Sequence, residues 1–94
     1  MDAAHFPVVG IFRNDTEREL RLHLEMLAAE VVLSPGHEVE LLARPSEGLL
    51  PLTIDLVEGG LQIHPAREFD PEWHVRFNGK LLEARWPTIL KEHE

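Results

Sequence analysis

The sequence contains neither cysteine nor tyrosine, and only 9 of its 94 residues are lysine or arginine. Without cysteine the chain has no disulfides, no thiolate metal ligands and no cysteine nucleophile. Nucleic acids and anionic lipid surfaces attract clustered Lys and Arg side chains, and the basic residues here are not clustered. We therefore expect no nucleic-acid partner and no membrane partner.

Long apolar runs are missing as well. No run approaches the roughly 20 residues of a membrane-spanning helix, and the first residues, MDAAHFP, lack the basic and apolar regions of a signal peptide. A cytoplasmic location is the resulting expectation. The net charge of -8 is spread along the chain and is typical of a small soluble protein. Length and composition predict one domain over residues 1–94, with 1–7 and 86–94 as loose or interface-forming termini.

Alternation of apolar and polar residues is the main structural signal that is present. In LTIDLVEGGLQIH (52–64), Gly59-Gly60 separates two alternating runs, which is the pattern of a type I′ hairpin. Counting outward from that turn places Asp55 opposite His64 and gathers the apolar residues on one face.

A second hairpin is predicted in WHVRFNGKLLEA (73–84). Asn78-Gly79 is the strongest short hairpin signal, and counting outward from it places His74 opposite Glu83. One face is again apolar and includes Trp73, which we expect in the core. Because turn and periodicity agree in two separate stretches, an all-β fold is favoured.

The stretch TERELRLHLEMLAAE (16–30) fits two structures. As a helix it would have a capping box at Thr16 and Glu19. As a strand it alternates strictly from Leu20 to Met26. We favour the strand, because a helix would leave Leu22 and Met26 off its apolar stripe, and we expect a bulge or bend near residues 26–29, where the alternation breaks.

The remaining segments complete the expected architecture. Alternating or apolar runs at 8–12, 30–33 and 37–43 are separated by turn residues, among them Pro35-Gly36. The whole sequence predicts a single antiparallel β-sandwich, or a flattened barrel, of about seven to eight strands.

Four short motifs stand out along the chain: Asn14-x-Thr16, Leu20-x-Leu22-x-Leu24-Glu25, Leu33-x-Pro35-Gly36 and Phe77-Asn78-Gly79. These motifs resemble those of a group of small bacterial proteins of uncharacterised function. The resemblance implies an all-β fold and brings no activity with it. The sequence departs from the group at residues 26–28, where the group has proline, an aromatic residue and glycine.

Six histidines are the obvious candidates for chemistry, although the sequence lacks HxH and HExxH. If the two hairpins were neighbours in one sheet, His64, His74, Asp55 and Glu83 would form a shallow cluster able to hold Zn²⁺ or Cu²⁺. The alternative, which we prefer, is two solvated cross-strand pairs. No other cofactor is expected.

Nucleophilic catalysis has little to draw on. The two serines, Ser34 and Ser46, adjoin proline turns and have no GxSxG setting, and no glycine-rich phosphate loop is present. The pair Glu38 and Glu40 fits an exposed strand face. We therefore do not expect an enzyme.

The C-terminal segment has two interpretations. Trp86, Ile89 and Leu90 either pack within the domain or form a homodimer contact, as exposed apolar residues near a terminus often do. For function, we expect a non-catalytic module, alone or as a homodimer, that binds a protein or peptide through an exposed edge strand or loop end. The alternatives are a small metal-binding or cupin-like protein and an accessory subunit of a larger enzyme.

Overall fold

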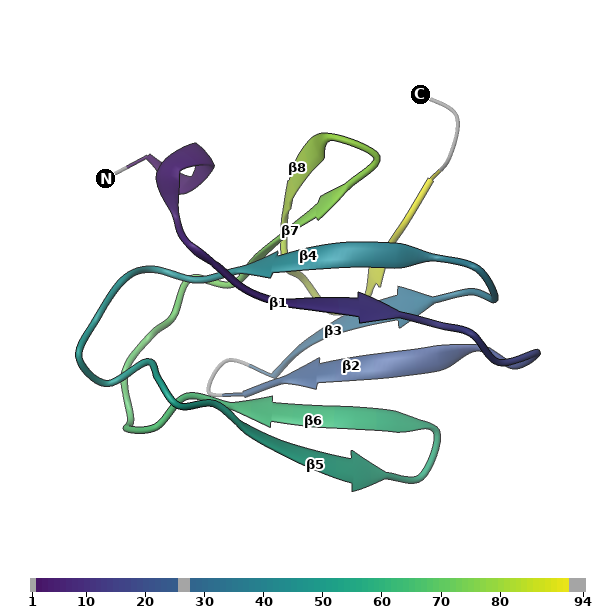
Figure 1. Ribbon diagram of the computed structural model, residues 1–94, viewed down its shortest axis with the longest axis horizontal. Helices are drawn as coiled ribbons and strands as arrows, with labels where there is room; N and C mark the ends of the chain where they lie inside the picture. The colour runs from purple at the N-terminus through teal and green to yellow at the C-terminus, as the bar shows by residue number, and fades with distance from the viewer. Residues whose placement is uncertain (1, 26–27, 92–94) are drawn as a thin grey trace.

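The protein, described by a computed structural model at residues 2–25 and 28–91, is all-β (Figure 1). These residues form nine strands and one short 3-10 turn, η1 (Ala3–His5). The strands are β1 (Val8–Arg13), β2 (Leu20–Leu24), β3 (Ala29–Leu33), β4 (Glu38–Leu42), β5 (Thr53–Val57), β6 (Gly60–His64), β7 (His74–Phe77), β8 (Lys80–Glu83) and β9 (Thr88–Ile89).

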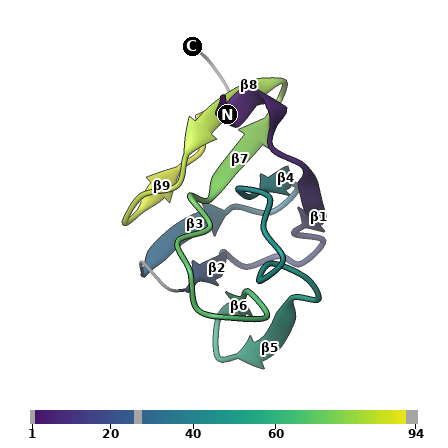
Figure 2. The ribbon, with the colours of Figure 1, turned by 90° about the vertical axis from the view of Figure 1, so that its left-hand side faces the viewer.

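Two sheets face each other as a sandwich and do not close into a barrel (Figure 2). One sheet has the order β1-β4-β7-β8, and the other has the order β5-β6-β2-β3-β9. The predicted all-β sandwich is thus confirmed. The expectation of a purely antiparallel fold is wrong for the second sheet, because β6 pairs with β2, and β9 with β3, in parallel. Both strands return to that sheet after the chain has visited the other one.

The ambiguous stretch at 16–30 contains strands and no helix in its described residues, as favoured. It forms β2 and the start of β3, which pair antiparallel from Leu20 opposite Leu33 to Leu24 opposite Ala29. The predicted bend is confirmed at Ala28, where φ is +53°, whereas Met26 lies outside the described residues. The strand is favoured over the helix because alternate residues of β2 and β3 point into the core between the sheets. These residues are Leu22, Leu24, Ala29, Val31 and Leu33.

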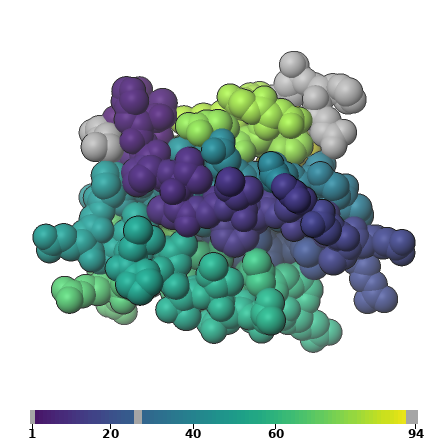
Figure 3. Space-filling model, in the orientation of Figure 1, coloured from purple at the N-terminus to yellow at the C-terminus, as the bar shows by residue number. Residues whose placement is uncertain are grey.

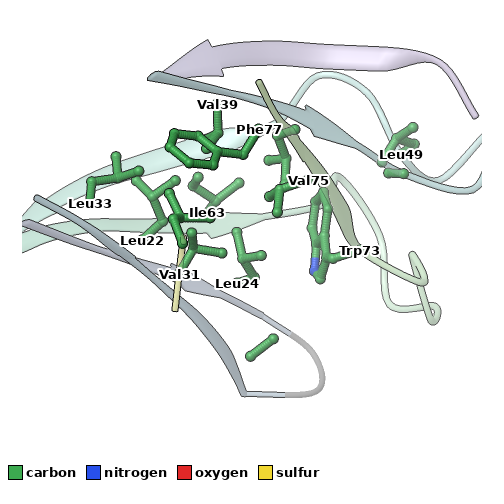
Figure 4. Packing of buried hydrophobic residues seen from close by; sticks show 14 residues of the cluster. Leu22, Leu24, Val31, Leu33, Val39, Leu49, Ile63, Trp73, Val75 and Phe77 are labelled. Atoms are coloured by element: carbon green, nitrogen blue, oxygen red, sulfur yellow. The ribbon is translucent and has the colours of Figure 1, made fainter. Parts of the chain in front are cut away.

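The core lies between the inner faces of the two sheets (Figure 4). Trp73 is buried there, as predicted, and its indole N–H donates to the Glu25 carbonyl at 2.7 Å, so that its polar atom is paired. Burying a valine, leucine, isoleucine or phenylalanine side chain completely contributes about 1.5–3 kcal/mol to the stability of the fold. The buried cluster comprises Leu22, Leu24, Ala29, Val31, Leu33, Val39, Leu41, Ala43, Leu49, Ile63, Trp73, Val75, Phe77 and Leu90.

The Asn14-x-Thr16 motif has a structural role where the chain crosses from β1 to β2. Asn14 is fully buried, and its amide donates to the carbonyls of Arg18 at 2.7 Å and Leu33 at 2.9 Å. Its side-chain oxygen accepts from the backbone N–H and the hydroxyl of Thr16, at 3.0 and 2.6 Å. Every polar atom of this side chain is therefore satisfied inside the fold.

The β7–β8 hairpin has the predicted register, with His74 opposite Glu83. The β5–β6 register is shifted. Val57 lies opposite Gly60, so Gly60 belongs to β6 and is not a turn residue. A Cβ added at Gly60 would lie 1.9 Å from the Arg21 carbonyl oxygen of β2. Only glycine allows β6 to approach β2 this closely, and that requirement moves the turn one residue earlier.

Each terminal segment is anchored to the fold by buried residues, although most of its described residues are exposed. Phe6 is buried and meets the His74 ring edge-on at 5.6 Å, so the segment expected to be loose at 1–7 is held there. At the other end β9 pairs with β3, and Leu90 joins the core. Residues 2–25 and 28–91 contain no helix that is both long and apolar enough to cross a membrane.

Replacing Gly60 by alanine tests the close approach of β6 to β2. We expect Gly60→Ala to lower the free energy of unfolding by about 3 kcal/mol or more, because the new methyl group overlaps backbone that cannot move aside. Gly36→Ala is the matched control. Gly36 has φ +84° and open space around its Cα, so only backbone strain of about 1–2 kcal/mol is expected. Urea unfolding measures both, and equal losses would contradict the argument.

Asn14→Ala tests the buried amide. We expect a loss of about 2–4 kcal/mol, because the substitution leaves buried carbonyl groups without a donor. Thr16→Val, at an exposed position of the same turn, should cost less than about 1 kcal/mol. The two variants are compared by thermal and urea unfolding. An Asn14→Ala protein as stable as the parent would refute this role.

Candidate functional site

The first histidine–carboxylate pair forms, but diagonally. His64 Nε2 lies 3.5 Å from Asp55 Oδ2, although the residue directly opposite His64 is Thr53. The shifted turn explains the difference. Both side chains are partly exposed, so the contact is a weak solvated pair on the outer face of the five-stranded sheet.

The second predicted histidine–carboxylate pair is in register, but its histidine makes contacts with other residues. His74 lies opposite Glu83. The Nδ1 atom of His74 is 2.6 Å from the Glu72 carbonyl oxygen, and its ring packs against Phe6. His74 is therefore held by the residues that precede β7 and by the N-terminal segment.

The four-residue metal cluster, considered as the less favoured alternative, required both hairpins to lie side by side in one sheet. The β5–β6 hairpin, with Asp55 and His64, belongs to the five-stranded sheet, whereas β7–β8, with His74 and Glu83, belongs to the four-stranded sheet. Within residues 2–25 and 28–91, no group of three or more histidine or carboxylate side chains is arranged to hold a metal ion. The two pairs are not neighbours in one sheet.

A buried carboxylate that the sequence analysis missed lies on the outer face of the five-stranded sheet. Glu30 accepts a hydrogen bond from Arg21 Nη1 at 2.5 Å and lies 3.6 Å from His23 Nδ1. The hydrogen bond to Glu30, followed by that to Glu19, raises the pKa of the Arg21 guanidinium above its ordinary value. Since Glu30 is charge-paired by a permanent cation, it is a structural ion-pair centre and not a free base.

The residues expected at an interface divide into two kinds. Leu90 is buried in the core, which agrees with the interpretation that it packs within the domain and not with an interface role. Trp86 and Ile89 are 66% and 56% exposed. Trp86 also lines an open hollow of about 550 Å³, together with His23 and Val57. Thr88, Ile89 and Leu90 are buried, exposed and buried in turn, as expected where successive side chains point to opposite faces.

Most of the sheet edges carry devices that hinder pairing with another strand. Each sheet has two edges, formed by β1 and β8 in one and by β5 and β9 in the other. The register of β1 shifts between Val8 and Gly10, β8 begins with Lys80, and β9 has two residues. Irregularities, lysines and short edge strands all discourage edge-to-edge association.

The β5 edge has none of these protections in its described residues. Its five residues contain neither lysine nor proline, and its pairing with β6 is regular. All five are exposed, including Ile54 at 48% and Leu56 at 87%. Ile54 lies opposite Ile63, a fully buried core residue, so it is on the inner face of the sheet. We define Thr53–Val57 with its free backbone edge as the β5 edge.

Arrangement of the sheets explains why an inner face is exposed. Seen along the strands, β5 lies at the end of its sheet, past the edge strand β1 of the opposite sheet (Figure 2). In the space-filling view, the teal-green surface that includes β5 is open below the purple surface of β1 (Figure 3). No strand of the four-stranded sheet covers Ile54 and Leu56 within the described residues.

The backbone of β5 also points outward at these same residues. The Ile63 carbonyl accepts a hydrogen bond from Glu25 N at 2.9 Å, so the polar groups of Ile63 face β2 and not β5. In an antiparallel pair, the residue opposite such a position turns its own N–H and C=O away as well. The backbone N–H and C=O groups of Ile54 therefore point to solvent. Those of Leu56, two residues further along the strand, point the same way.

Comparisons with protein-family models, with curated proteins and with solved structures found no match. On the structure, the β5 edge is the surface best suited to a partner. It presents unpaired backbone donors and acceptors and exposed apolar side chains on the same two residues, Ile54 and Leu56. An exposed edge strand is expected from the sequence, but its position is not, because the alternation of β5 resembles that of a covered strand.

The division of the C-terminal residues can be tested by two alanine substitutions. Leu90→Ala should lower the free energy of unfolding by about 2 kcal/mol, because it leaves a cavity in the core. Trp86→Ala should change it by less than about 0.5 kcal/mol, since the side chain is mostly exposed. Denaturant unfolding provides both values. The reverse order of effects would show that Trp86 is the packed residue.

Proposed function

We propose that the protein is a non-catalytic interaction module that binds an extended protein segment as an additional strand at the β5 edge. The observation that carries the proposal is the contrast among the sheet edges. Three are short, irregular or charged with lysine, whereas β5 is regular and exposes Ile54 and Leu56. Edge strands of this kind pair readily with other chains.

The chemistry of the edge defines the segment it would accept. Main-chain hydrogen bonds at Ile54 and Leu56 would supply affinity without regard to sequence. Apolar side chains at alternate positions of the segment would lie beside the exposed side chains of Ile54 and Leu56. On the outer face, the segment would meet Thr53 and the carboxylate of Asp55. A segment with a hydrogen-bond donor opposite Asp55 is favoured there.

The charged clusters elsewhere support a binding role over a catalytic one. The Glu30 carboxylate is engaged by Arg21, and the Glu25 carboxylate accepts from the Gln62 amide at 2.6 Å. On the other sheet, the Glu38 carboxylate, by hydrogen bond and then by charge, raises the pKa of Arg13 above its ordinary value. Groups paired in this way stabilise the faces of the sandwich and are not poised to transfer protons.

Selection from a random peptide display library on the sparsely immobilised protein tests the proposal. We expect selected peptides to alternate apolar and polar residues and to lose at least about tenfold in affinity against Leu56→Pro. Proline removes a backbone donor that points to solvent, so it leaves the pairing with β6 intact. Ile11→Lys, at an exposed site on β1, is the control and should bind normally. Peptides that bind the Leu56→Pro variant normally but fail to bind the Trp86→Ala variant would contradict the proposal. Such a result would place the binding site at the hollow lined by Trp86.

A further inference from the structure

The β5 edge can be examined for its fit to a second copy of itself. When two identical strands pair antiparallel about a two-fold axis, the residue on the axis faces its own counterpart, and the flanking residues face one another in mirrored order. Hydrogen bonds form only if the outward-pointing residues of both copies meet. Because Ile54 and Leu56 point outward, even-numbered residues must face even-numbered residues.

Charge selects among the remaining registers. An axis at Asp55 would set two carboxylates face to face, which is unfavourable. An axis at Leu56 would place Glu58 against the apolar side chain of the partner's Ile54. Neither register is therefore favoured, although both satisfy the backbone.

An axis at Ile54 satisfies both faces of the sheet. On the inner face, Ile54 would meet the partner's Ile54, and the exposed Leu56 would cover the partner's Leu52, which is half-buried against the core. On the outer face, the Thr53 hydroxyl would donate to the carboxylate of the partner's Asp55, and the reverse contact would form by symmetry. The only charged residue of β5 thus gains a donor, and no like charges meet.

From this self-complementarity we infer that the segment bound at the β5 edge is β5 of a second copy, paired antiparallel with Ile54 on the two-fold axis. The inference rests on the proposed function and names its partner. The two five-stranded sheets then join into one continuous sheet across the dimer. The side chains of Ile54 and Leu56 lie on the inner face of the sheet, and those of both copies then form a single apolar strip.

Sedimentation equilibrium over a range of concentrations tests the dimer. The parent protein should approach twice the chain mass of 10.8 kDa. Leu56→Lys should weaken self-association by at least about tenfold, because the substitution occurs twice in each dimer and places a charge on the apolar strip. Ile11→Lys, on the edge strand of the other sheet, should dimerise like the parent. Far-ultraviolet circular dichroism confirms that each variant is folded.

The register is tested by single cysteines, which the cysteine-free chain makes unambiguous. Ile54→Cys should form an intermolecular disulfide in air, since facing hydrogen-bonded residues have Cα atoms about 5.5 Å apart. Asp55→Cys and Leu56→Cys should not, because displacement along the strand takes their Cα pairs beyond about 7 Å. The products are read on non-reducing gels.

The outcomes separate the inference from the proposed function. A monomer at every concentration, a dimer insensitive to Leu56→Lys, or cross-linking at position 55 or 56 in preference to 54 would each overturn the inference. If the protein is monomeric yet selects strand-like peptides that Leu56→Pro rejects, only the second copy is excluded and the proposed function stands. If neither peptides nor a second copy bind at β5, both fail.

Discussion

The parallel contact between β6 and β2 is the constraint on which the rest of the arrangement depends. It is permitted by a missing side chain, because any Cβ at Gly60 would collide with the Arg21 carbonyl. Once β6 is seated beside β2, its hairpin partner β5 must be the outermost strand of that sheet. The position of the exposed edge thus follows from one glycine in a neighbouring strand.

A sheet of five strands faces a sheet of four strands, so the larger sheet extends past the smaller one. The strand β5 lies in the part that extends past it. Burying a leucine or isoleucine side chain is worth about 1.5–3 kcal/mol, and this fold leaves that energy unrealised at Ile54 and Leu56. Asp55 is the one charged residue of β5, and the pairing of β5 with β6 remains regular there. Exposed apolar side chains and unpaired backbone groups occur together at β5. At the other edges, lysine, irregular pairing or short length hinders pairing with another strand.

The parts of the structure that depend on neighbouring residues could be predicted from the sequence. Asn78-Gly79 sets its hairpin register locally, and alternation identified β2 as a strand despite its helix-forming composition. The features that failed depend on distant segments. The turn before Gly60 is displaced by β2, and the proposed metal cluster required knowing which sheet each hairpin would join. Glu30 and Leu90 likewise depend on the C-terminal segment, which returns to β3 from a distant part of the sequence.

The size of the β5 edge limits how tightly it can hold a partner. Stable protein interfaces bury about 1,200–2,000 Å² in total, and a strand of five residues offers only a few side chains and the hydrogen bonds of alternate residues. Each net hydrogen bond adds about 0.5–1.5 kcal/mol, and association must first offset the loss of translational and rotational freedom. The proposed self-association at β5 would therefore be reversible and concentration-dependent. At low concentration the same backbone groups would be open to any extended segment that matches the pattern of β5.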